Sequence, residues 1–383
     1  MKISDLTTLK YIVNSPIGLD VGATSVSMAQ LKRTSKGWSV RDMQLKEIPV
    51  SNEENGGSRK DAIIQTIKDI LKSSSFSGRS VVSVMPDYQL DIFPVKLALS
   101  GDNSVEEAIL KEAGAHLSYK AENAVIDYLL VDNDEDEQDK ARTVSSLLLA
   151  ARREDVDEHL SILRGAKLKP IAIDIAACAL SRIIRASSAK QVESALIINM
   201  GQLHSTLTLL WEDNILLDRN IPWGRENMIE ILMNKLKLKR EEADRLLNRV
   251  GLHPRQIEDA GPESETNEQT NRVSEAVYEI VAPQLEKLAK EIDKVFQYVA
   301  SEMRGATIDD IYLTGEGSNI KNLDIYLIKR TDVSTKYFNP LSALQKRGNG
   351  VSEDNNSHDS FYSVALGLAM RGLENQDMTN GRE

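Results

Sequence analysis

The chain contains one local pattern twice, and this repeat constrains its fold more than any other feature. In the first copy an apolar strand runs from Ile17 to Gly22, and an alternating strand begins after a polar turn at Ser25. In the second copy the apolar strand runs from Ala195 to Gly201, and it is followed by a polar turn and another alternating strand. Period-two alternation around short glycine turns predicts antiparallel hairpins. Two copies in one chain predict a duplicated lobe.

The length and charge of the chain limit the possible classes of protein. A chain of 383 residues exceeds what one hydrophobic core usually organises, so two domains are expected. The 47 basic and 58 acidic residues leave a net charge of -11, which opposes general attraction to nucleic acid or to an anionic membrane surface. A local basic patch is still compatible with this charge. The single cysteine excludes an internal disulfide, and the five histidines lack metal-ligand spacing.

No segment has the features of a membrane anchor or a secretion signal. Residues 1–14 lack the apolar core of a signal peptide. No stretch approaches the ~20 apolar residues of a membrane span. We therefore expect a cytoplasmic protein without direct membrane insertion, whose role at a membrane would run through a partner.

The pattern between and after the two hairpins predicts further subdomains. Short strands and helical spacings between residues 80 and 165 predict an α+β module inserted in the first lobe. A long amphipathic stripe from Val273 to Met303 predicts a helix, with Pro283 inside it. The expected organisation is a first lobe at 15–192 with 356–373 returning to it, an inserted subdomain at 80–165, a second lobe at 193–345, a helical subdomain at 224–304, and a disordered tail at 374–383.

Both glycine turns have the composition of an anion-binding turn. Backbone N–H groups of a glycine turn approach a phosphate closely because no Cβ intrudes and the amides converge. The polar residues of the turns are Gly22, Thr24 and Ser25 in the first copy and Gly201, Ser205 and Thr206 in the second. A single glycine turn of this kind usually has no ligand. The interpretation as an anion-binding site therefore rests on the duplication.

Two further positions extend this candidate site. Asp20 ends an apolar strand beside the first turn, where a buried carboxylate is costly without a cation or hydrogen bonds. A water-linked Mg²⁺ or the amides of the turn itself would each satisfy it. Gly315, Glu316 and Gly317 follow a predicted strand and precede a predicted helix, an order that aims backbone amides at a ligand.

Motifs along nearly the whole chain resemble one known family. They are Ile17-Gly-Leu-Asp-Val-Gly-Ala-Thr-Ser-Val26, Ser83-Val-Met-Pro86, Asp127-Tyr128, Pro170-Ile-Ala-Ile-Asp174, Ile221-Pro-Trp-Gly224, Leu313-Thr-Gly-Glu-Gly317, Asn339-Pro-Leu341 and the segment Tyr362 to Gly372. With them the chain resembles the actin-like ATPase superfamily. Within it the chain is most similar to the PilM-like proteins of type IV pilus assembly, which are related to FtsA and to the cytoplasmic part of GspL from type II secretion.

This resemblance implies a fold, a ligand and a partner. The fold would be an α/β actin-like (ribonuclease H-like) duplication, with two lobes around a nucleotide cleft and an inserted α+β subdomain. ATP and Mg²⁺ would bind there, with Asp20 contacting the metal through water. The nucleotide-binding positions would be Asp20, Gly22, Thr24, Ser25, Asn199, Gly201, Ser205, Gly315, Glu316 and Gly317. The cytoplasmic tail of a PilN-type single-pass membrane protein would dock between the module and the first lobe. The chain would then be a scaffold at the inner face of the cell membrane.

Three residues depart from the family pattern at the expected nucleotide site. Asn199 stands where the second hairpin of the family has Asp, and it lacks the charge that helps to hold magnesium. Glu316 places a carboxylate in a turn that is usually all glycine, where it would oppose an anionic ligand unless it points to solvent. Leu247 takes the position that commonly supplies a lysine near the adenine. We therefore expect weak or no ATP hydrolysis.

Two other functions remain compatible with the same fold. One is an active ATPase or a phosphotransferase of the sugar-kinase type, which needs magnesium, a base and an acceptor pocket. Asp174 is a candidate cleft carboxylate for that function, although a structural hydrogen-bonding role is the simpler interpretation. The other is a filament-forming division protein like FtsA, which the polar segment 374–383 disfavours because it offers no amphipathic membrane helix. The sequence does not distinguish a pilus machine from a type II secretion machine.

Overall fold

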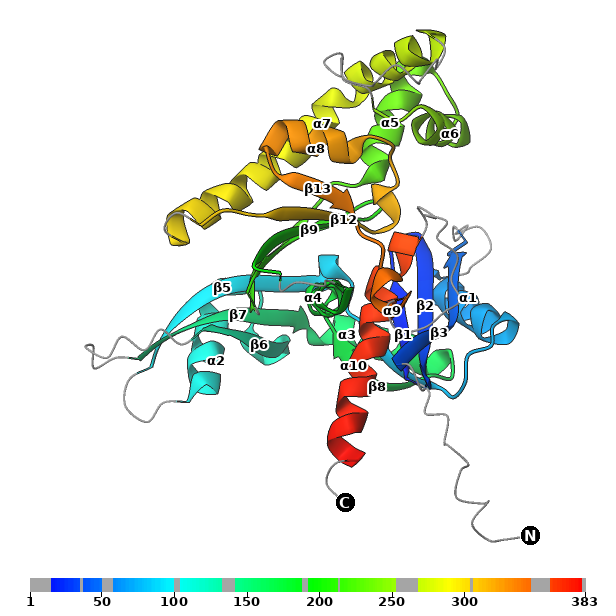
Figure 1. Cartoon of the computed structure of the whole chain (residues 1–383). Coiled ribbons are helices and arrows are strands. Elements are labelled where there is room, and N and C mark those ends of the chain that lie inside the picture. The colour runs from blue at the N-terminus through cyan, green and yellow to red at the C-terminus, as the bar shows by residue number, and fades with distance from the viewer. Residues whose placement is uncertain are drawn as a thin grey trace. The chain divides into compact units, whose positions relative to one another are not determined.

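The described residues of the computed structural model form two compact units (Figure 1). The first unit lies within residues 1–85, 158–188 and 339–383, and the second lies within 86–157 and 189–338. The structure describes residues 15–34, 37–49, 58–99, 104–132, 142–187, 192–212, 214–252, 268–303, 306–345 and 359–380. Each unit is built around a five-stranded mixed sheet.

The sheet of the first unit starts with the predicted three-stranded meander. Its strands are β1 (Ile17–Val21), β2 (Ser25–Thr34), β3 (Gly37–Glu47), β4 (Ser80–Val84) and β8 (Lys169–Asp174). Their order is β3-β2-β1-β4-β8, with antiparallel pairs from β3 to β1 and parallel pairs from β1 to β8. Alternation along β1 places the Ile17 and Leu19 side chains on one face and leaves Gly18 and Asp20 on the other.

Helices cover both faces of this sheet. On the face of Ile17 and Leu19 pack α1 (Arg59–Ser73) and the later turns of α3 (Arg153–Gly165). The opposite face is covered by α10 (Ser363–Asn380), which also packs on α4 (Ala176–Ser187) (Figure 1). Gly18 permits this approach, because a Cβ there would lie 1.9 Å from the carbonyl oxygen of Ala365.

The sheet of the second unit repeats that of the first. Its strands are β9 (Ser194–Met200), β10 (Ser205–Trp211), β11 (Asn214–Ile221), β12 (Asp310–Thr314) and β13 (Ser334–Tyr337). The order is β11-β10-β9-β12-β13, again with two antiparallel pairs followed by two parallel pairs. Strand order and direction therefore match in the two sheets, and the predicted duplication is confirmed.

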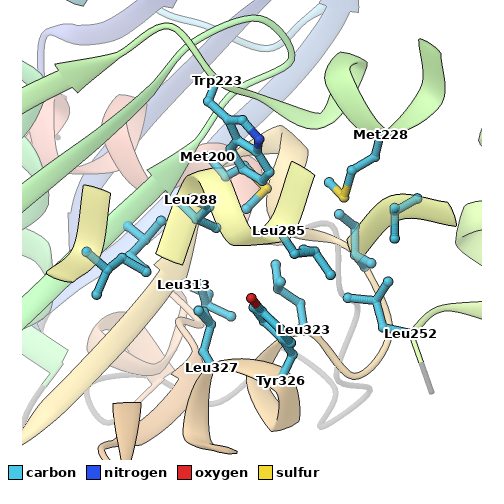
Figure 2. Packing of buried hydrophobic residues seen from close by; sticks show 14 of the residues in the cluster. Met200, Trp223, Met228, Leu252, Leu285, Leu288, Leu313, Leu323, Tyr326 and Leu327 are labelled. Atoms are coloured by element: carbon cyan, nitrogen blue, oxygen red, sulfur yellow. The ribbon is translucent and has the colours of Figure 1, made fainter. Parts of the chain in front are cut away.

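Helices and one face of this second sheet enclose the largest core of the described residues. The helices are α5 (Arg225–Leu236), α6 (Arg240–Val250), α7 (Glu268–Glu302) and α8 (Leu323–Thr331). Met200 and Leu313 from the sheet pack with Leu285 and Leu288 of α7 and Leu323 of α8 (Figure 2). The amphipathic stripe along α7 is thus a packing seam, as its 3.6-residue spacing predicts.

The α+β module was predicted as an insertion in the first lobe at 80–165, but it groups with the second unit as residues 86–157. The prediction differed because β4 and the later turns of α3 pack in the first unit. Strands β5 (Leu90–Leu99), β6 (Ala124–Asp132) and β7 (Arg142–Arg152) form an antiparallel sheet in the order β5-β7-β6, and α2 (Val105–His116) packs against it. Strand β6 was not predicted. Its sequence does not alternate cleanly, because apolar residues stand at consecutive positions such as Val125 and Ile126. In the structure Ile126 and Tyr128 pack against the module core, whereas Val125 and Asp127 are exposed.

Element boundaries differ from the predictions at two places near the C-terminus. The helix predicted directly after the third glycine turn begins only at Leu323, because a 3-10 turn at residues 316–318 comes first. The last α-helix, α10, runs to Asn380 although a disordered tail was expected from 374, and its backbone continues through a segment without Pro or Gly. Residues 133–141, 253–267 and 381–383 lie outside the described residues, and the last of these ranges belongs to the predicted tail. Among the helices that are described, none is long and apolar enough to cross a membrane.

Candidate functional site

The two glycine turns are identical in length and closure. Val21 pairs with Val26 across the first turn, and Met200 pairs with Ser205 across the second, so each turn contains four residues. In each turn the glycine amide donates a hydrogen bond of 2.9 Å to the carbonyl of the residue three positions later, from Gly22 to Ser25 and from Gly201 to His204. The duplicated sequence pattern therefore produces a duplicated backbone.

The amides at the tips of both turns have no acceptor among the described residues. Ala23 and Thr24 in the first turn donate no hydrogen bond from their backbone N–H groups to any residue that the structure describes. The same holds for Gln202 and Leu203 in the second. Consecutive unsatisfied N–H groups at a turn form a concave anion site. Each turn thus retains two donors for a phosphate oxygen.

The register assigns the polar residues of the second turn differently from the sequence prediction. His204 takes the place of Ser25, and Ser205 takes that of Val26, one residue past the turn. Ser205 is a buried residue of β10, and its Oγ has no hydrogen-bond partner among the described residues. The neighbouring Thr206 Oγ1, which projects to the opposite face of the sheet, is equally buried and unpartnered. Sequence alone could not reveal this one-residue offset, since both assignments keep a hydroxyl near the glycine.

Different donors hold the carbonyl groups of the two turns. In the first turn the Arg59 guanidinium donates to the carbonyls of Gly22 at 3.2 Å and Ala23 at 2.8 Å. In the second, the backbone amides of Arg225 and Glu226 at the start of α5 donate to Gly201 at 3.1 Å and Gln202 at 2.9 Å. A guanidinium and a helix N-terminus both place positive charge beside the turn, which favours an anion.

Sequence reasoning did not single out Arg59. Its helix start is readable, because Ser58 caps α1 by accepting a hydrogen bond from the Asp61 amide. The distance of 36 residues between Arg59 and Ala23 left no local signal for their contact.

Asp20 lies half-buried on the face of the sheet opposite Leu19. Burial raises the pKa of the Asp20 carboxyl to about 6. Neither a hydrogen bond nor an ion pair to this carboxylate occurs within the described ranges, so it does not cap the amides of the turn. An oxygen ligand held in this state suits a hydrated magnesium ion, which would restore the charged form.

The third glycine turn packs directly against the second. A Cβ on Gly317 would lie 2.3 Å from the Gly201 carbonyl oxygen, and a Cβ on Gly315 would lie 2.6 Å from the Asn199 Oδ1. Gly315 also has a φ of 89°, a region that favours glycine. The structure therefore brings together the predicted residues Asn199, Gly201, Gly315 and Gly317, and it shows that backbone packing by itself requires these glycines. Glu316 lies half-buried in the same turn.

A buried arginine joins this site to α6. Arg225 is 3% exposed, and its guanidinium donates to Asp244 Oδ1 at 3.0 and 3.1 Å and to Asn248 Oδ1 at 2.8 Å. It also donates to the Asn319 carbonyl at 3.2 Å. Leu247, the position expected near an adenine, is instead fully buried in the core. The α6 residues that face the start of α5 are therefore Asp244 and Asn248.

Asp174 is held by arginines. Its carboxylate forms ion pairs with Arg371 at 2.9 Å and Arg182 at 3.3 Å, and it accepts a hydrogen bond from the Ile175 amide at 2.9 Å. These contacts use both carboxylate oxygens. The side chain thus has the structural role that was the simpler interpretation, and it is not poised as a base.

An aromatic contact reaches the second turn from the start of the module. The rings of Tyr88 and His204 stack with their centroids 5.5 Å apart and an interplanar angle of 28°. Tyr88 lies in a 3-10 turn at 87–89, directly after Pro86. Since His204 replaces the serine of the first turn, the two turns present different side chains to a ligand.

Each unit by itself carries groups that suit an anionic ligand. The first unit supplies a carboxylate with a raised pKa, two tip amides and the Arg59 charge. The second supplies two tip amides, an uncharged amide at Asn199 and a glycine cradle that a Cβ would fill. No group of three or more His, Cys, Asp or Glu side chains in the described part of the chain is placed to hold a metal directly. Magnesium would therefore be held through water and phosphate oxygens.

Comparison with known families gives one match over nearly the whole chain. The model of the family described as type IV pilus assembly protein PilM matches residues 18–373. This span includes both sheets, the module and the three glycine turns.

Solved structures show the same fold. The structure described as the PilM-PilN type IV pilus biogenesis complex has a TM-score of 0.76 and 22% identity, covering 94% of this chain and 98% of the other. The ethanolamine utilization protein EutJ from Carboxydothermus hydrogenoformans has a TM-score of 0.53 and 11% identity, with 94% and 89% covered. MreB 5 of Spiroplasma citri, solved with AMPPNP, has a TM-score of 0.50 and 13% identity, with 95% and 98% covered. The chain therefore has the actin-like ATPase fold that was predicted.

Proposed function

The chain belongs to the family of type IV pilus assembly protein PilM, and from that premise we propose that it is a cytoplasmic scaffold of a type IV pilus assembly platform. It binds the short cytoplasmic tail of a PilN-type membrane protein. Nucleotide serves as a structural or switching ligand. Through this partner the scaffold is held at the inner face of the cell membrane.

The observation that carries this proposal is the extent of the family match. It runs from residue 18 to residue 373 and includes the module at 86–157, so the two units lie within it except for residues 1–17 and 374–383. The match to the structure described as the PilM-PilN complex covers 98% of the matched chain. A shared fold alone would not assign a function. Membership of the family adds the pilus machine and its membrane partner.

The glycine turns favour nucleotide binding, whereas the side chains near the expected site disfavour hydrolysis. Four unsatisfied tip amides and the raised pKa of Asp20 favour binding of a magnesium nucleotide. Hydrolysis further requires a group that orients the attacking water. Asn199 is uncharged, and Asp174 is neutralised by Arg182 and Arg371. We therefore expect binding with little or no turnover, which separates this scaffold from a sugar-kinase-like phosphotransferase.

The module offers apolar side chains for a partner. Leu110 on α2 is 56% exposed, and Leu130 on β6 is 50% exposed. Single exposed leucines are common, but these two lie on the small three-stranded module. A short peptide that buries either leucine would gain roughly 1.5 kcal/mol or more from that side chain. We expect the module to contribute to the PilN-type site.

Titration calorimetry of the purified full chain tests both ligands. A synthetic peptide with the N-terminal cytoplasmic sequence of the PilN-type protein of the same organism should bind, and a scrambled peptide should not. Leu110→Asp and Leu130→Asp should each be compared with the control Ile328→Asp. Ile328 is a similarly large apolar residue on α8, outside the module, and it is 40% exposed. A loss of peptide affinity in a module variant, with Ile328→Asp unchanged, would support the proposed contact.

A second titration with Mg-ATP, followed by measurement of phosphate release, addresses the nucleotide role. Saturable binding with no release above background is the expected result. Rapid turnover would contradict the scaffold role, and absence of peptide binding would contradict the proposed partner.

A further inference from the structure

The connection between α5 and α6 carries a cluster of exposed lysines. We call residues 235–239 the lysine loop. Lys235, Lys237 and Lys239 are exposed, Leu236 between them is 41% exposed, and Leu238 packs partly against the core. The chain as a whole has a net charge of -11, so this concentration of positive charge runs against the overall balance.

Lys237 occupies a position that normally takes glycine. It is the C-cap of α5, with φ 57° and ψ 36° in the left-handed region. Helices that end this way usually place Gly or Asn there, because a Cβ makes this conformation unfavourable. The chain keeps a lysine at this place at a cost in local stability.

Lys239 also contradicts the local preference. It is the N-cap of α6, and no side-chain hydrogen bond is made by Lys239 to the helix. Ser, Thr, Asp and Asn are preferred at an N-cap because their oxygen accepts an amide hydrogen bond, and a cation is unfavourable at this end of the helix dipole. Two of the three lysines therefore stand where the helix termini favour other residues.

The lysines of the lysine loop form no ion pair with the residues that the structure describes. Arg240 next to the loop pairs with Glu226, and the Glu242 carboxylate accepts a hydrogen bond of 2.8 Å from the Lys239 amide. For Lys235, Lys237 and Lys239 no ion pair occurs with any residue in the described ranges. Positions that break local rules without a structural gain are typical of functional surfaces.

We propose that the lysine loop is a contact site for anionic phospholipid headgroups. Three exposed lysines that form no ion pair with a described residue alternate with exposed or half-buried leucines. This pattern matches an anionic membrane surface, where lysines meet phosphates and an apolar side chain enters the interface. An acidic protein segment would also attract the three lysines, but it would leave the exposed Leu236 without a role. The loop contacts the membrane without crossing it.

The expected affinity is small for the loop alone and larger in the assembly. Each lysine near an anionic surface strengthens binding by about fivefold, so three contribute about 100-fold. The effect falls steeply with salt, because it is screened within a Debye length. A membrane-anchored partner would raise the local concentration of the loop at the bilayer and make a weak contact effective. That last step rests on the proposed function, whereas the lipid contact itself does not.

Vesicle co-sedimentation of the full chain tests the proposal. Vesicles contain phosphatidylcholine alone or with about one third phosphatidylglycerol, at low and high salt. The triple variant Lys235→Gln, Lys237→Gln, Lys239→Gln is compared with a control, Lys167→Gln, Lys287→Gln, Lys290→Gln, which removes the same charge from exposed lysines elsewhere. We expect wild-type and control proteins to bind only anionic vesicles at low salt. The loop variant should lose about 100-fold in partitioning, and Leu236→Ser a few-fold.

Three results would overturn the proposal: no binding to anionic vesicles at low salt, equal losses in the two triple variants, or loop-dependent binding of polyglutamate without binding of vesicles. Circular dichroism checks that each variant is folded. The PilN-type peptide is titrated into the same proteins. Peptide binding without vesicle binding would reject only the lipid contact, and vesicle binding without peptide binding would reject only the proposed partner.

Discussion

Asp20 and Asn199 occupy the same register position in the two duplicated sheets. Asp20 pairs with Ser27 two residues before the first turn glycine, and Asn199 pairs with Thr206 two residues before the second. The two positions differ by one side-chain atom and one charge. The second copy shows that this site in the fold accepts an uncharged amide, so the charge of Asp20 is not required for folding.

Replacing Asp20 by Asn should therefore stabilise the protein at neutral pH. Burial raises the folded-state pKa of Asp20 to about 6 from its ordinary value of 3.8, so ionisation opposes folding above pH 6 and has no effect below the unfolded pKa. The variant should exceed wild type by about 1–3 kcal/mol in the free energy of unfolding above pH 6. The difference should vanish as pH falls toward 4. Urea unfolding from pH 4 to 8 measures it, and a destabilised variant at pH 7 would contradict the prediction.

His159 and Ser83 form a buried pair whose loss should be costly. The His159 Nε2 lies 2.9 Å from Ser83 Oγ, and both side chains are buried. Ser83→Ala leaves the imidazole without this partner and should cost about 1–3 kcal/mol. The double change Ser83→Ala, His159→Leu should cost less than the sum of the two single changes. Additive losses in a double-mutant cycle would show that the two side chains do not interact.

The same histidine should make the fold sensitive to acid. Burial lowers the pKa of His159 to about 4 from 6.5, so the unfolded state binds the proton first as pH falls. The stability that neutral His159 contributes is complete above pH 6.5 and is lost between pH 6.5 and 4. His159→Leu should flatten the pH dependence of unfolding in that window. An unchanged slope would show that another group controls it.

The two turn glycines should respond differently to alanine. A Cβ on Gly201 would lie 2.5 Å from the His204 carbonyl oxygen, whereas on Gly22 the nearest atom would be 3.4 Å away. Gly201→Ala should lower the free energy of unfolding by about 1–3 kcal/mol, and Gly22→Ala by less than about 0.5 kcal/mol. Thermal and urea unfolding compare the matched pair. Equal losses would mean that the two turns differ less than their geometry indicates.

Arg225 should hold α6 to the second turn. Arg225→Gln removes the hydrogen bonds from the guanidinium to Asp244 Oδ1 and to Asn248 Oδ1, and it should cost about 2–3 kcal/mol. Hydrogen exchange of the α6 amides should accelerate. The control is Arg240→Gln, which removes a more exposed ion pair to Glu226 and should cost less than about 1 kcal/mol. Similar losses in both variants would contradict a special role for Arg225.

The sequence predicted only part of the candidate site. The residues that it did not predict all contact segments that are distant along the chain. Gly201, Gly315 and Gly317 were predicted from local patterns, and the structure brings them together. Arg59 and Arg225 were not, because their contacts join segments that sequence spacing does not relate. Their partners include the carbonyl of Ala23, 36 residues from Arg59, and that of Asn319, 94 residues from Arg225. Backbone carbonyls are present at every residue, so no residue type marks them in advance.

The sequence by itself determined the duplicated fold, because alternation, glycine turns and amphipathic spacing are local properties that act in every copy. Tertiary structure alone decided which residues face the turns. Strand register places His204 where a serine was expected, and core packing buries Leu247 while Asp244 faces Arg225. Register and packing depend on contacts between distant segments, which a linear pattern does not encode. The two sheets therefore have the same strand order and turn length, although their equivalent positions Asp20 and Asn199 differ in charge.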